Sequence, residues 1–136
     1  MDAHRIHLER VYDEVRAQEH PGQEEVPPGS RFLVDRLWPR GVRKSAVAEG
    51  RWIRDAAPSS ELRTWFGHDP SRFAEFAERY RAELEERPGV LAPILSAARS
   101  GPVTLLYAAK DTEHNHAVVL REHLESLLSS SGPGSN

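Results

Sequence analysis

Two short polar segments carry most of the residues that could do chemistry. The first, residues 35–41, reads Asp-Arg-Leu-Trp-Pro-Arg-Gly and follows an apolar run. It combines guanidinium groups, a carboxylate and an indole at a density that folding alone does not require. Guanidinium groups bind anions and can stabilise negative charge that develops in a reaction. We therefore expect Arg36, Trp38 and Arg40 to bind a polar or anionic small molecule, such as a nucleotide-like compound.

The second segment, residues 110–116, reads Lys-Asp-Thr-Glu-His-Asn-His and stands where a strand is expected to pass into a helix. Free backbone amides and the positive end of the helix dipole favour an anion at such a junction. Lys110 would add charge, and Asn115 lies in the same segment. Lys110 and Asn115 are therefore predicted to complete the binding site. The alternative is that Asp111 only caps the helix and that Lys110 is solvated.

The histidines are candidates for proton transfer if the protein is an enzyme. His114 or His116 would act as the acid or base, and Asp35 or Asp111 would orient the imidazole. The alternative for His116 is a partly buried ring that is hydrogen-bonded for structural reasons. His68 could reach the same pocket or face solvent from a loop. The sequence does not decide between binding and catalysis, and it identifies no cofactor.

A metal-dependent hydrolase is a weaker alternative. His114 and His116 stand two positions apart, so on a regular helix they point about 200 degrees away from each other and cannot chelate one ion. A metal site would need a later helix start and a third ligand such as His68, Asp69 or Asp111. No metal ligand is therefore assigned.

Apolar periodicity predicts the elements that must position these residues. Strands are expected within residues 5–12, at 31–35 and at 103–107, the last being central and covered on both faces. Helices are expected at 58–67, from the Asp69-Pro70 cap through residue 84, at 88–99, and from residue 111 or 112 onward. This alternation favours an α/β fold, with residues 1–128 as a single domain and a small, mostly parallel sheet flanked by helices.

Parallel pairing would bring the two polar segments together. If strands 31–35 and 103–107 are parallel neighbours, the loops that follow them leave the same edge of the sheet and face each other. Neighbouring residues on a strand alternate between faces, so Asp35 and Arg36 are expected on opposite sides. Residues 13–29, rich in proline and glutamate, are predicted to form an exposed loop, and residues 129–136 a disordered tail.

The bulk composition excludes several classes of protein. The chain has 136 residues, a net charge of -3 and no cysteine. Disulfides, thiolate catalysis and cysteine-ligated metals are thus excluded. No apolar stretch approaches the roughly 20 residues that span a bilayer, so we expect a cytoplasmic protein with no membrane partner.

Two further kinds of partner follow from local patterns. A nucleic-acid-associated binding module would use a local basic face, although the mixed overall charge argues against a general basic surface. That face would comprise Arg40, Arg43, Lys44, Arg51 and Arg54. A homodimer would use Val118 and Val119, which the helical pattern places on the outward side of the last helix.

Three long motifs resemble the YeaO-like family, known as domain of unknown function 488. They are LVDRLWPRGV, APSSELRTWFGHDPSRFAEFAERYRAEL and GPVTLLYAAKDTEHNHAVVL, in this order. The resemblance covers about residues 5–128, and the insertion at 13–29 departs from it. It implies a compact α/β fold of bacterial origin without implying a particular activity. The shared motifs fall on the polar segments identified above.

Overall fold

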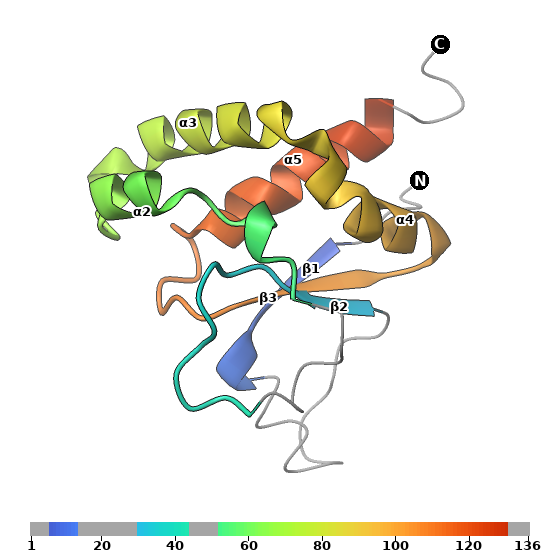
Figure 1. Ribbon diagram of the computed structural model, residues 1–136, viewed down its shortest axis with the longest axis horizontal. Helices are drawn as coiled ribbons and strands as arrows, with labels where there is room; N and C mark the ends of the chain where they lie inside the picture. Colours follow the sequence, from blue (N-terminus) through green and yellow to red (C-terminus); the bar gives the residue numbers. More distant parts are fainter. Residues whose placement is uncertain (1–5, 14–29, 44–51, 131–136) are drawn as a thin grey trace.

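The computed structural model describes residues 6–13, 30–43 and 52–130, and these form an α/β fold (Figure 1). Three parallel strands pair in the order β1-β3-β2, where β1 is Ile6–Arg10, β2 is Ser30–Leu33 and β3 is Val103–Tyr107. All five residues of β3 are buried, as expected for a central strand. The predicted parallel arrangement of the second and third strands is confirmed.

The two faces of the sheet are covered differently. Phe32 and Leu105 belong to the main core, which the helices cover, whereas Leu33 and Leu106 belong to a smaller cluster on the other face. This follows from the strand period of two, which sends successive side chains to opposite faces. Figure 1 shows α3, α4 and α5 on one side of the sheet. The smaller cluster includes Trp38.

Local signals set the bounds of α2, which is Ser60–Phe66. The Ser59 hydroxyl accepts a hydrogen bond from the Leu62 amide, which would otherwise lack a partner in the first turn. The helix ends at Gly67, whose φ of 56° is left-handed. Both ends agree with the sequence prediction.

Two further helices follow the predicted pattern with short 3₁₀ turns at their starts. Asp69 caps the turn Pro70–Arg72, which leads into α3, Phe73–Glu86. The turn Pro88–Leu91 leads into α4, Ala92–Ser100. A third 3₁₀ turn, Arg54–Ala56, precedes α2. Within α3, the buried residues recur at intervals of three and four and form its core face: Phe76, Ala77, Tyr80 and Leu84.

The last helix, α5, begins later than predicted: it spans His116–Ser130. The Asp111 carboxylate accepts hydrogen bonds from the amides of Glu113 and His114, which holds the preceding residues in a turn. The Asn115 side-chain oxygen then accepts from the Val118 amide and caps the helix. The cap is therefore Asn115, and Asp111 stabilises the turn before it.

Two other predictions about the C-terminal part need correction. Val119 is buried, at 1% exposure, within the main core, so it cannot form an outward dimer face with Val118. The predicted tail begins too early, because residues 129 and 130 belong to α5. Residues 131–136 lie outside the described residues, and so do residues 14–29, which are all but the first residue of the predicted loop at 13–29. No helix in the described part of the chain is long and apolar enough to span a membrane.

Candidate functional site

A pocket of about 660 Å³ opens where the chain leaves β2 and β3. Its walls come from the loop after β2, the segment before α2, α2 itself with the turn that follows it, and the segment from β3 to the start of α5. Phe76 of α3 also contributes. The lining residues are Asp35, Arg36, Leu37, Ala57, Pro58, Arg63, Thr64, Phe66, His68, Phe76, Ala108, Ala109, Lys110, Asp111, Asn115 and His116. The two polar segments read from the sequence therefore meet in space.

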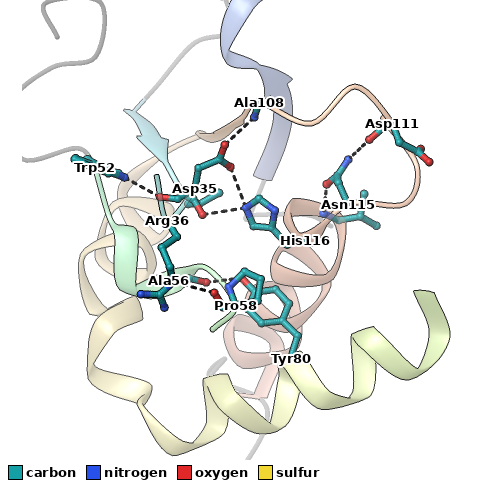
Figure 2. Close-up of polar contacts among 12 residues, drawn as sticks. Asp35, Arg36, Trp52, Ala56, Pro58, Tyr80, Ala108, Asp111, Asn115 and His116 are labelled. Atoms are coloured by element: carbon teal, nitrogen blue, oxygen red, sulfur yellow. Dashed lines mark hydrogen bonds and ion pairs between the residues drawn. The ribbon is translucent and has the colours of Figure 1, made fainter. Parts of the chain in front are cut away.

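Asp35 joins the two segments directly (Figure 2). Its Oδ2 accepts a hydrogen bond of 3.1 Å from the Ala108 amide, just beyond β3. Its Oδ1 lies 3.1 Å from Nε2 of His116, and both side chains are only 15% exposed. The same Nε2 lies 2.9 Å from the Val34 carbonyl oxygen. These contacts hold the start of α5 against the end of β2.

Arg36 lines the same pocket as Asp35, contrary to the expectation that they occupy opposite faces. The alternation holds only on a strand, and β2 ends at Leu33, so the chain has already begun to turn. The Arg36 Nε donates to the Pro58 carbonyl oxygen at 3.0 Å. This bond ties the loop after β2 to the segment that leads into α2.

Asp111 and Asn115 shape the other wall. Hydrogen bonds from the Glu113 and His114 amides lower the pKa of the Asp111 carboxyl below its usual value. The Asn115 side chain donates to the Asp111 carbonyl oxygen at 2.7 Å and is 2% exposed. Its amide and carbonyl groups are thus both engaged in holding the turn.

A row of aromatic rings underlies the pocket. Phe66 and Phe76 stack with centroids 4.3 Å apart, Phe76 and Tyr80 follow at 5.7 Å, and the Tyr80 ring lies 6.3 Å from that of His116. Tyr80 is fully buried, and its hydroxyl donates to the Ala56 carbonyl oxygen. Burial raises the pKa of this hydroxyl well above its ordinary value, so it remains a donor. The floor of the pocket is therefore apolar and well packed.

The lining includes seven of the ten residues selected from the sequence. These are Asp35, Arg36, His68, Lys110, Asp111, Asn115 and His116. His68 follows Gly67 in a second left-handed conformation, with φ of 58°, in the tight turn between α2 and the next element. His114 does not line the pocket. Its Nδ1 lies 3.1 Å from Asp111 Oδ2 and its ring packs edge-on against Phe73.

Trp38 and Arg40 also lie away from the pocket. The Trp38 ring packs edge-to-face on Trp52 with centroids 5.1 Å apart, in the cluster on the other face of the sheet, and its Nε1 donates to the Val42 carbonyl oxygen. Arg40 is exposed, and its carbonyl oxygen accepts from Tyr12. The chain bends at Arg36 and Leu37, ahead of Trp38, which directs the rest of the segment away from the pocket. A turn at Gly41, whose φ is 80°, ends the segment.

Sequence reasoning did not select Arg63 and Thr64, which line the pocket from α2. Arg63 is exposed, as a solvated surface arginine would also be. Its only sequence signal is its position three residues before Phe66, and this signal becomes useful only once α2 is known to pack against α3 beside the pocket. That placement depends on the tertiary structure, which the spacing of residues in the sequence does not specify.

The structure bears on the metal alternative and leaves the basic face a prediction. Among the residues that the structure describes, no group of three His, Asp or Glu side chains could hold a metal ion. Of the proposed basic face, Lys44 and Arg51 lie outside the described residues. The Arg54 guanidinium lies over the Trp52 ring, 5.2 Å from its centroid.

Comparison with known proteins assigns the chain to a family. A family model described as "Inactive DUF488-N3 subclade" matches residues 5–135. The chain belongs to the DUF488 family. The uncharacterized protein YeaO of Escherichia coli (strain K12) is 40% identical over 122 residues, which cover 90% of this chain and 98% of YeaO. The resemblance read from the sequence motifs is thus confirmed.

Relatives of this family also occur in mycobacteria. The uncharacterized proteins Rv3073c of Mycobacterium tuberculosis (strain H37Rv) and Mb3100c of Mycobacterium bovis are each 38% identical over 120 residues, covering 88% of this chain and 93% of theirs. No solved structure matches the chain significantly. The family description and these names assign no ligand or reaction, so function has to be argued from the pocket.

Proposed function

We propose that this DUF488 protein binds a small organic anion in the pocket at the ends of β2 and β3. The observation that carries the proposal is the composition of the lining. Three cationic side chains, Arg36, Arg63 and Lys110, surround a cavity whose floor includes the stacked rings of Phe66 and Phe76. Cations fix an anionic group, and an apolar lining favours a ligand that also has an organic body. A nucleotide-like molecule has both features.

The size of the pocket agrees with such a ligand. About 660 Å³ lies within the range of roughly 300–1,000 Å³ typical of small-molecule sites. The position also agrees, because ligands of open α/β sheets bind beyond the carboxyl ends of the strands. Asn115, which caps α5, lines the same cavity.

We propose binding without turnover as the primary role. The family model that matches this chain is described as inactive. The side chains of Asp35, Asp111 and Asn115 each hold a backbone amide or carbonyl group in place, which is a structural task. A ligand-binding role needs only the cations and the floor.

A thermal-shift assay tests the proposal. The probes are adenosine monophosphate, glucose 6-phosphate, citrate and inorganic phosphate at low salt. A probe present at about a hundred times its Kd should stabilise the fold by about 2.7 kcal/mol and raise the Tm accordingly. We expect at least one organic anion to do so for the wild type.

A matched pair of double variants locates the binding. Arg63→Ala with Lys110→Ala removes two cations from the pocket, whereas Arg40→Ala with Arg43→Ala removes two exposed cations that do not line it. We expect the shift to disappear in the first variant and to persist in the second. Equal shifts in both variants, or no shift with any probe, would refute the proposal.

A further inference from the structure

The protons on the His116 ring follow from its two neighbours. Its Nε2 lies 2.9 Å from the Val34 carbonyl oxygen and 3.1 Å from Asp35 Oδ1. A carbonyl oxygen only accepts hydrogen bonds, and so does an ionised carboxylate. Nε2 therefore carries a hydrogen and donates to Val34. In the neutral ring Nδ1 has no hydrogen, and no described residue forms a hydrogen bond with it.

The carboxylate of Asp35 is incompletely compensated. Its Oδ2 accepts from the Ala108 amide, but its Oδ1 is buried and receives no hydrogen bond from a described residue, although Nε2 of His116 is within ion-pair distance. A buried carboxylate oxygen without a donor is unfavourable. A positive charge on the adjacent imidazole would compensate it. A second proton on the ring, at Nδ1, would supply that charge.

The other charged groups that line the pocket with His116 determine its net charge. The lining carries three cations and two carboxylates, with His68 as a further titratable group. Tyr80, which faces the ring from α3, stays neutral because burial raises its pKa. The net charge of the lining is therefore one positive, and a proton on His116 makes it two. The charged groups are Arg36, Arg63, Lys110, Asp35 and Asp111.

We propose that the pocket takes up one proton at Nδ1 of His116 when it binds the dianion of a phosphate monoester. The inference rests on the proposed binding function and specifies the chemical class of the ligand. A phosphate monoester carries about -1.5 to -2 charges at neutral pH, which matches a lining with two positive charges. The proton comes from solvent, adds to the Nδ1 lone pair and breaks no covalent bond.

Calorimetry with adenosine monophosphate measures this proton directly. The titration is done near neutral pH in PIPES, HEPES and Tris, whose ionisation enthalpies differ. If binding takes up a proton, the observed heat changes linearly with the ionisation enthalpy of the buffer, and the slope gives the number of protons. We expect a slope of about one proton for the wild type and no proton uptake with adenosine, which lacks the phosphate.

Two substitutions assign the proton. His116→Gln should abolish the buffer dependence and weaken binding of adenosine monophosphate roughly ten- to a hundredfold, as expected for a lost hydrogen bond to a charged group. His68→Gln removes the other histidine that lines the pocket and should leave the slope unchanged. A slope that disappears in His68→Gln and persists in His116→Gln would overturn the assignment.

Nitrogen-15 NMR of the imidazole rings gives an independent readout that does not depend on the fold of a variant. In the free wild type at mildly alkaline pH, the His116 signals should show hydrogen on Nε2 and none on Nδ1. Saturation with adenosine monophosphate should protonate Nδ1. An Nδ1–H tautomer in the free protein would refute the inference.

The outcomes separate this inference from the function on which it rests. Adenosine monophosphate that binds without proton uptake would overturn the inference and leave the binding function standing. If only citrate shifts the Tm, the phosphate monoester assignment is wrong and anion binding remains. If no probe binds, both proposals fail.

Discussion

Replacing Tyr80 by phenylalanine removes one hydroxyl group from the centre of the structure and leaves the ring in place. The hydroxyl donates to the Ala56 carbonyl oxygen, and both residues are 0% exposed. Water therefore cannot replace the lost donor. The variant keeps the ring contacts with Phe76 and His116, so the lost hydrogen bond dominates the change.

The expected cost follows from the burial of that carbonyl. Leaving a buried acceptor without its partner costs about 1–3 kcal/mol of the free energy of unfolding. For a domain of this size, that corresponds to a Tm decrease of roughly 3–10 °C. Because the hydroxyl joins α3 to the segment before Ala57 and Pro58, the loss loosens one wall of the pocket.

Urea denaturation measures the effect, with tryptophan fluorescence as the signal. We expect the midpoint to fall while the m-value is unchanged, because the surface exposed on unfolding stays the same. The matched control is Tyr12→Phe, which also removes a hydroxyl that donates to a backbone carbonyl, that of Arg40, but at an exposed position. Water can replace that bond, so we expect a change below about 0.5 kcal/mol. Equal destabilisation by the two substitutions would refute the reasoning from burial.

Three further predictions concern local contacts. Ser59→Ala removes the cap of α2 and a hydrogen bond to Glu83, so we expect a loss of about 1–2 kcal/mol in urea denaturation. Gly67→Ala should cost about 1–2 kcal/mol in the same assay, because its φ of 56° is unfavourable for a residue with a Cβ, although the added Cβ meets only the Thr64 carbonyl oxygen at 3.6 Å. The control Gly89→Ala, where φ is not in the left-handed region and the added Cβ meets no atom, should not destabilise the fold. The two backbone hydrogen bonds that lower the pKa of the Asp111 carboxyl stabilise the fold at pH values above 3.8, the ordinary pKa of this group. This stabilisation is lost as the pH falls through the lowered pKa. The stability difference between wild type and Asp111→Asn should therefore shrink in acid, and a difference that grows there would contradict the assignment.

Much of the fold could be predicted from local patterns. The run at residues 103–107 has the length and β-branched content of a doubly covered strand, and β3 occupies these residues as the central strand. The helix α2 lies within the predicted range 58–67, since the Ser59 cap and Gly67 that bound it depend on atoms a few residues apart. The start of α5 was misplaced because Asp111 and Asn115 can each act as a cap.

The site, too, could be predicted from the sequence only in part. The motifs alone indicated that the loops after the second and third strands would carry polar groups and, for parallel strands, would meet. Asp35 and His116, 3.1 Å apart, follow from that topology. By contrast, Arg63 lines the pocket only because α2 packs against α3. Trp38 lies apart from the pocket because the chain bends at Arg36 and Leu37 and then packs Trp38 against Trp52.

The amino-acid sequence by itself determined the positions of the strands and helices to within a few residues, and the cap at Asp69. Each of these depends on periodicity and on hydrogen bonds between residues close in the chain, which spacing encodes directly. Only the tertiary structure decided which side chains share the pocket. The residues that share the pocket depend on how the helices pack on the sheet and on how the loops turn after the strands end. Both result from many weak packing contacts between residues far apart in the chain.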